Sequence, residues 1–212
     1  MTIRAEVPAD YVAVEALTRE AFWNNYTPGC DEHYLVHMMR FAPEFLPALA
    51  LVAEEDGRIV GSIMYSKAAV VDINGTRHEI LTFGPLSVLP AYQRRGIGKA
   101  LMAESFRLAE AMDYIAVAIY GNPENHKTSG FACCKQFGIH RGDGRFPAAL
   151  LVRELKPHAL DGISGGFEIA PFYELDSAAA TAFDAKFPSK ERLENTPSQL
   201  QFQSLVGALA EE

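Results

Sequence analysis

The stretch GPLSVLPAYQRRGIGKALMAESFRLAEAM, residues 84–112, carries the strongest structural signal in this chain. It opens with an apolar, strand-like segment and bends at Pro90. The loop QRRGIG at 93–98 follows, and Leu101 and Leu108 then recur with the spacing of one helix face. The stretch predicts a strand, a glycine-containing turn and a helix at about 96–112.

The loop has the features of an anion-binding site. Gly96 and Gly98 allow the backbone to turn its N–H groups inward and allow close approach of a bulky group. The start of the helix adds unpaired N–H donors and a partial positive charge. Arg94, Arg95 and Lys99 raise the local potential. The loop therefore suits a pyrophosphate bound without a metal, although a plain left-handed turn before a helix would also fit the glycines.

Two other phosphate-binding motifs fit the loop poorly. A Walker A loop needs Gly-Lys-Ser/Thr, but Gly98-Lys99 is followed by Ala100, which has no hydroxyl for Mg²⁺. A dinucleotide fingerprint needs a third glycine where Leu101 stands. ATP and a dinucleotide are both disfavoured.

The totals describe an acidic globular chain. Its 212 residues suffice for one large domain, or one domain with an added element, and 49% are apolar. Nineteen basic and 27 acidic residues give a formal net charge of −8. Such a charge argues against a nucleic-acid partner and is compatible with a cationic or amine substrate.

Three cysteines without framework spacing indicate reduced thiols. The adjacent pair Cys133-Cys134 lies in an apolar segment, so packing is favoured over a thiol acceptor or an acyl-cysteine intermediate. No apolar run reaches the length of a membrane span, and the N-terminal residues lack the apolar core of a secretory signal. We expect a cytoplasmic protein without a membrane partner.

The remaining pattern predicts a mixed sheet. Asp56-Gly57 and Asn74-Gly75 are hairpin signals that separate three antiparallel strands. The continuous apolar run YIAVAIY at 114–120 is typical of a strand covered on both faces and paired in parallel across the preceding helix. The other expected strands lie at 2–7, 49–54, 58–71, 78–88 and 147–155, with a further strand FEIAPFYEL at 167–175 in the tail. The other expected helices lie at about 8–24 and 31–43 (the second capped by Asp31), with a short helix near 124–135 and two helices in the tail.

The stretch at 84–112, with its flanks, resembles motif A of the GNAT N-acetyltransferase superfamily. The match covers about 81–120 closely and 3–155 more loosely. The resemblance implies an α/β (α+β) fold, with a mixed, mostly antiparallel central sheet flanked by helices, and acetyl-CoA as cosubstrate with no metal. It implies a GNAT domain over 1–155 and a C-terminal extension, strand plus helices, over 156–212. The implied cofactor-binding residues are Leu86, Ser87, Val88, Gln93, Arg94, Arg95, Gly96, Ile97, Gly98, Lys99 and Asn122.

The segment GNPENHKTSGF, residues 121–131, resembles a GNAT subgroup with Gly-Asp/Asn-Pro after the fifth strand. Where that subgroup commonly has a tyrosine as general acid, this chain has His126. An imidazole can donate a proton near neutral pH, but it is shorter than a phenol. Three readings stay open: His126 is the acid, water or another group assists the thiolate, or catalysis is degraded.

Glu79, at the start of the fourth strand, is the candidate base, and an exposed structural carboxylate is its alternative. His33 and His37 share a helix face and could line the acceptor site, whereas a metal site would need a third ligand. Acidic residues Glu32 and Glu44, with neighbouring Asp31, could attract a cationic acceptor or form a solvated face.

The resemblance implies acetyl transfer to a primary amine by direct attack in a ternary complex. The acceptor would be a small molecule or a peptide, and a homodimer is possible. The alternative is a non-catalytic acyl-CoA sensor or interaction domain of the same fold.

Overall fold

The computed structural model describes residues 1–210. Within them, nine strands form one sheet in the order β1-β2-β3-β4-β5-β8-β6, and β9 pairs with β3 and β7. The strands are β1 Thr2–Ala5, β2 Leu51–Glu55, β3 Arg58–Val71, β4 Arg77–Val88, β5 Ala116–Tyr120, β6 Ala132–Cys133, β7 Ile139–Arg141, β8 Leu150–Glu154 and β9 Gly165–Glu168. The α-helices are α1 Tyr11–Phe22, α2 Glu32–Met39, α3 Ile97–Ala111, α4 Pro123–His126, α5 Ser177–Asp184 and α6 Pro197–Gly207.

The antiparallel part of the sheet follows the predicted hairpins. Asp56 and Gly57 both have positive φ, 53° and 75°, as a tight two-residue turn requires. At the next turn, the Asp72 carboxylate accepts the amides of Asn74 and Thr76. β2, β3 and β4 are antiparallel neighbours, so the three predicted strands are confirmed.

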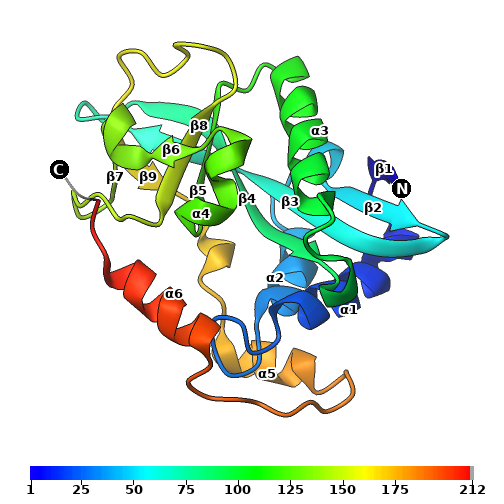
Figure 1. Ribbon diagram of the computed structural model, residues 1–212. Coiled ribbons are helices and arrows are strands. Elements are labelled where there is room, and N and C mark those ends of the chain that lie inside the picture. Colours follow the sequence, from blue (N-terminus) through cyan, green and yellow to red (C-terminus); the bar gives the residue numbers. More distant parts are fainter. Residues whose placement is uncertain (211–212) are drawn as a thin grey trace.

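The mixed part of the sheet is built around α3. Helix α3 connects β4 to β5, and these strands pair in parallel, as the apolar run predicted. Within residues 1–210, β4 and β5 pair only at Leu81 and Val117. Beyond that pair the two strands separate, although β4 continues to Val88 (Figure 1).

A bulge in β4 accompanies the separation. Tyr65 on β3 pairs with Phe83, but Ile63 pairs with Leu86, so β4 contains one extra residue over this interval. Beyond the bulge, Ser87 donates to the hydroxyl of Thr18 on α1. Leu86, on the other face, borders α3. Helices α1 and α3 therefore cover opposite faces of the sheet.

Close packing fixes α3 on the sheet. A Cβ added to Gly61 on β3 would lie 2.9 Å from Ile97 and 3.1 Å from Leu101, so only glycine permits this approach. Tyr65, fully buried, shares a hydrogen bond of 2.8 Å with Ser105 on α3. These contacts hold the N-terminal end of α3 beside the end of β4.

The structure corrects three local expectations. The single helix predicted near 124–135 is α4, a 3-10 turn, strand β6 and a second 3-10 turn. Gly130, with φ of 76°, ends the helical part because a left-handed residue cannot continue it. The tail strand covers only Gly165–Glu168, and Asp31 starts α2 without a side-chain cap.

The tail runs back across the fold. β9 extends the sheet beside β3 and β7, and α5 and α6 follow along one side of the molecule (Figure 1). Within residues 1–210, no helix combines the length and the apolar character needed to cross a membrane.

Candidate active site

A cleft opens where β4 and β5 separate. We call it the β4/β5 cleft; its volume is about 390 Å³. Leu86 lies on the β4 side, Gly98 and Lys99 on the α3 side, and Asn122 and His126 beyond the end of β5. Five of the thirteen predicted site residues thus lie around one cavity.

The loop before α3 has free donors at the mouth of this cleft. Arg94 and Gly96 have φ of 59° and 83°, and this turn leads the chain directly into the helix. In the described chain, no hydrogen-bond acceptor meets the amides of Gly96, Ile97, Gly98 and Lys99. Four consecutive N–H groups and the helix dipole therefore remain available for an anion.

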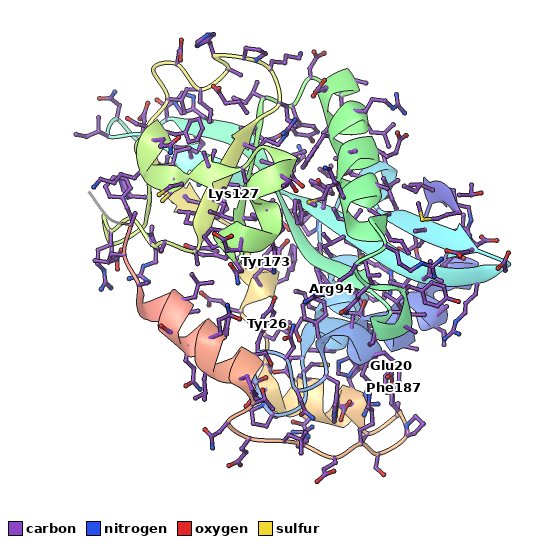
Figure 2. All side chains as sticks on the ribbon, viewed as in Figure 1. Glu20, Tyr26, Arg94, Lys127, Tyr173 and Phe187 are labelled. Carbon is purple, nitrogen blue, oxygen red and sulfur yellow. The ribbon has the colours of Figure 1, made fainter. Side chains whose placement is uncertain are left out.

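The side chains of the loop have different roles. The Gln93 amide donates to the carbonyl of Val88 at 3.1 Å and so ties the loop to β4. Arg95 is turned aside to Glu55, at 2.8 Å. Arg94 and Lys99 are exposed and make no ion pair within residues 1–210, and Figure 2 shows Arg94 at the N-terminal end of α3.

Two further predicted residues have side chains that are buried away from the cleft. The Ile97 side chain is buried in the core between α3 and the sheet. Ser87 is buried, and its hydroxyl bonds to Thr18 on the face away from α3. Of these two residues, only the main chain can take part in binding at the cleft.

His126 lies in a largely apolar part of the cleft. Its ring centroid is 5.5 Å from that of Phe131 and 6.1 Å from that of Phe83. A Cβ on Gly121 would lie 2.9 Å from the imidazole, so the histidine packs directly on that backbone. Burial lowers the pKa of His126 below its usual value, and its Nδ1 has no hydrogen-bond partner among the described residues. The imidazole is therefore neutral at pH 7.

Glu79 lies elsewhere. It forms an exposed ion pair of 3.0 Å with Lys67, near the start of β4. It lines a separate hollow with Glu44 and Arg77, and not the β4/β5 cleft. Glu79 and His126 therefore line different cavities.

A second cavity adjoins the cleft. We call it the α6 cavity; its volume is about 470 Å³, and α6 forms one wall through Phe202, Leu205 and Val206. The two cavities share a set of residues from the α1–α2 region and the end of β5: Tyr26, Glu32, Tyr120, Gly121, Asn122 and Asn125. The β4/β5 cleft and the α6 cavity thus meet at these residues.

Glu32 and Tyr26 are the ionisable groups of α2 and the preceding loop at this junction. Burial raises the pKa of Glu32 to about 7, although its carboxylate accepts the amide of Asp31 at 3.2 Å. Burial, with the nearby Glu32 charge, also raises the pKa of Tyr26. No cationic side chain pairs with Glu32 in residues 1–210. The sequence offered Glu32 only as one of three acidic residues near a helix, and nothing in the sequence around Tyr26 or Phe202 marked them.

Other candidates serve packing. The ring of His33 lies 3.2 Å from Asp184 on α5, and His37 lies 3.0 Å from Glu15 on α1, so neither lines the two cavities, contrary to expectation. Cys134 is buried, and burial raises the pKa of its thiol to about 12, which suits the packing role.

The sequence pattern of the Acetyltransferase (GNAT) family matches residues 16–138, more than half of the chain. The chain belongs to this family. As a GNAT acetyltransferase it is an acyltransferase enzyme, and the implied fold class, a mixed sheet flanked by helices, is confirmed.

Similar proteins match this GNAT acetyltransferase over most of their own length. The uncharacterized N-acetyltransferase YhbS of Escherichia coli is 27% identical over 165 residues, 78% of this chain and 93% of YhbS. The crystal structure of YhbS in complex with CoA has a TM-score of 0.71 at 26% identity, covering 82% of this chain and 92% of that one. A GNAT acetyltransferase from Brucella melitensis in complex with acetyl-CoA has a TM-score of 0.65 at 25% identity, covering 81% and 97%.

Proposed function

We propose that this GNAT acetyltransferase moves the acetyl group of acetyl-CoA to a primary amine by direct attack in a ternary complex. The observation that carries the proposal is the β4/β5 cleft leading to the free amides of Gly96–Lys99. The two similar structures with CoA or acetyl-CoA bound support the same cofactor here.

Each part of the cofactor has a matching feature. The pyrophosphate would accept hydrogen bonds from the amides of 96–99, with Arg94 and Lys99 adding positive charge. The pantetheine arm would lie along β4 beyond its bulge, where β5 no longer pairs. The thioester would then lie at the inner end of the cleft, near His126 and Asn122.

His126 would act on the departing sulfur. The imidazole is neutral at pH 7 because burial lowers its pKa. A neutral ring can still donate one N–H hydrogen bond to the developing thiolate, and this stabilises charge in the transition state. We therefore expect His126 to stabilise the leaving group through a hydrogen bond rather than by full proton transfer.

Two measurements test the proposal, and one variant tests the role of His126. Isothermal titration should detect binding of CoA to the folded protein, and mass spectrometry should detect acetylation in a panel of primary amines supplied with acetyl-CoA. His126→Gln should lower kcat about tenfold or more while the Kd for CoA changes little. Folded protein that binds no CoA would contradict the proposal.

A further inference from the structure

The tail of the chain builds one wall of a cavity that ends at a carboxylate. Phe202, Leu205 and Val206 line the α6 cavity from one side, and Glu32 lies where this cavity meets the β4/β5 cleft. Tyr26 stacks on Phe202 with ring centroids 4.5 Å apart, and Figure 2 shows it near the inner end of α6. The cavity therefore combines an apolar wall with a single anionic end.

Helix α6 is fixed at both ends, so this wall is a defined part of the fold. At its start, the Thr196 hydroxyl and the Gln199 amide both donate to the carbonyl of Asn24, at 3.2 and 3.3 Å. Past its end, the amide of Ala148 donates to the carbonyl of Ala208 at 3.1 Å. The helix thus spans from the α1–α2 loop to the segment before β8 (Figure 1).

We propose that the α6 cavity is the acceptor subsite, that it takes a primary amine carried on an apolar chain, and that Glu32 removes the proton from that amine. The inference rests on the proposed function, because it assigns the second substrate of the same reaction. The occupant follows from complementarity: an ammonium group matches the unpaired Glu32 carboxylate, and a hydrocarbon body matches Phe202 and Leu205.

The proton balance closes with Glu32 as base. The ammonium group gives one proton to the Glu32 carboxylate and becomes a neutral amine. The amine nitrogen attacks the thioester carbon, the C–N bond forms and the C–S bond breaks. The second proton leaves the nitrogen as the amide forms and ends on the CoA thiolate. Glu32 then returns its proton to water.

The ionisation of Glu32 suits this role. Its pKa, raised by burial to about 7, allows it to accept a proton near neutral pH and to release it again. The other ionisable groups facing the two cavities from neighbouring elements share the site with it: Tyr26, Lys99, Tyr120, His126 and Arg141, with Asp31 adjacent in sequence. Arg141 is paired with Asp143 and not with Glu32. Among the described residues that line the two cavities, Glu32 is the one carboxylate.

The first experiment uses hexylamine, ethylamine and hexan-1-ol as probes with the full chain saturated in CoA. Saturation-transfer NMR should show hexylamine binding at least tenfold more tightly than ethylamine, because four more methylenes are buried. Hexan-1-ol should bind more weakly than hexylamine. With acetyl-CoA, N-acetylhexylamine should form. Equal affinity for hexylamine and ethylamine, or preferred acetylation of peptide N-termini, would overturn the inference.

Variants separate the two parts of the subsite. Phe202→Ala with Leu205→Ala should raise the KM for hexylamine at least tenfold and leave the KM for ethylamine nearly unchanged. Leu200→Ala, an exposed residue of the same helix outside the cavity lining, is the matched control. An equal change for both amines would mean that α6 does not select the apolar chain.

Glu32→Gln should lower kcat at least a hundredfold and remove the limb of the pH–rate profile near pH 7. Glu124→Gln, an exposed carboxylate on α4, should change neither. An unchanged limb in Glu32→Gln would refute Glu32 as base. CoA titration distinguishes this failure from failure of the proposed function: intact CoA binding without hexylamine binding rejects only the acceptor subsite, whereas absent CoA binding rejects the cofactor assignment.

Discussion

Arg19 on α1 and Asp184 on α5 form an ion pair of 2.6 Å, although 165 positions separate them in the chain. Arg19 is buried, and the same carboxylate lies 3.2 Å from His33 on α2. Burial alone would raise the pKa of Asp184, but the hydrogen bond from Arg19 holds it below its usual value. One carboxylate thus joins the tail to both N-terminal helices.

Asp184→Ala should therefore destabilise the fold. Removal of one partner leaves the buried Arg19 guanidinium unpaired, which costs about 3 kcal/mol of unfolding free energy. Urea denaturation measures this loss. Asp161→Ala, in an exposed pair with His158, should stay within about 0.5 kcal/mol of the parent. A loss below about 1 kcal/mol in Asp184→Ala would contradict a structural role for the pair.

Gly98→Val should weaken CoA binding at least tenfold. A Cβ at Gly98 would be in ordinary contact with Leu86, 3.6 Å away, so the larger side chain fits the helix but projects into the β4/β5 cleft. Isothermal titration measures the change. Gly142→Val is the control, because no atom lies within 4 Å of its added Cβ. Unchanged affinity in Gly98→Val would place the cofactor elsewhere.

Lys99→Gln should reduce both the affinity for CoA and its dependence on salt. The exposed Lys99 lines the cleft, and its charge would attract the phosphates at low ionic strength. We expect a several-fold increase in Kd at low salt that shrinks as salt is added. Arg107→Gln, on the outer side of α3 and paired with Glu104, should leave both quantities unchanged. An equal effect of the two substitutions would indicate a general charge effect only.

Relative to His126→Gln, the parent should lose unfolding free energy as the pH is lowered from 7.5 to 5.5. Burial lowers the pKa of His126 in the folded state, so below pH 6.5 this histidine takes up its proton more readily in the unfolded chain than in the folded one. The contribution of His126 is therefore complete above that pH and is lost below it. Glu32 acts in the opposite direction, because burial raises its pKa to about 7, but it is present in both proteins and cancels in the comparison. Urea denaturation across this range measures the difference, and His158→Gln, at an exposed position, should show no such change relative to the parent. A constant difference between the parent and His126→Gln would contradict the prediction.

Local patterns predicted those parts of the fold that short-range chemistry determines. Asp56-Gly57 correctly predicted a hairpin turn, because both residues adopt the positive φ that such a turn requires. The apolar run ending at Tyr120 identified a parallel strand because such strands are covered on both faces. The prediction of one helix over 124–135 was wrong because Gly130 ends the helix and Ala132 pairs with Val152 on a distant strand. No local pattern reveals such a pairing.

In the candidate site, too, the sequence could predict the residues of one continuous motif but not those that the fold brings together from distant segments. Gly98 and Lys99 belong to a continuous motif, so the sequence alone could predict them as part of a cofactor-binding loop. Glu32, Tyr26 and Phe202 come from separate segments that only the folded tail brings together. Periodicity carries no information on contacts between such distant segments. Glu79 was predicted as a base from its position at the start of the fourth strand, but its distance from the cleft depends on where along β4 the strands separate, which the sequence does not reveal.

The bulge in β4 has a consequence for the ligand-free protein. From Phe83 to Val88 this strand pairs with β3 on one side, and within residues 1–210 no strand pairs with its other side. The sheet thus has an unpaired strand edge in its interior, between β4 and β5. An extended molecule with amide groups can pair with this edge as an added strand would. Occupation of that gap would join the two halves of the sheet, so the loaded enzyme should be stiffer across its centre than the empty one.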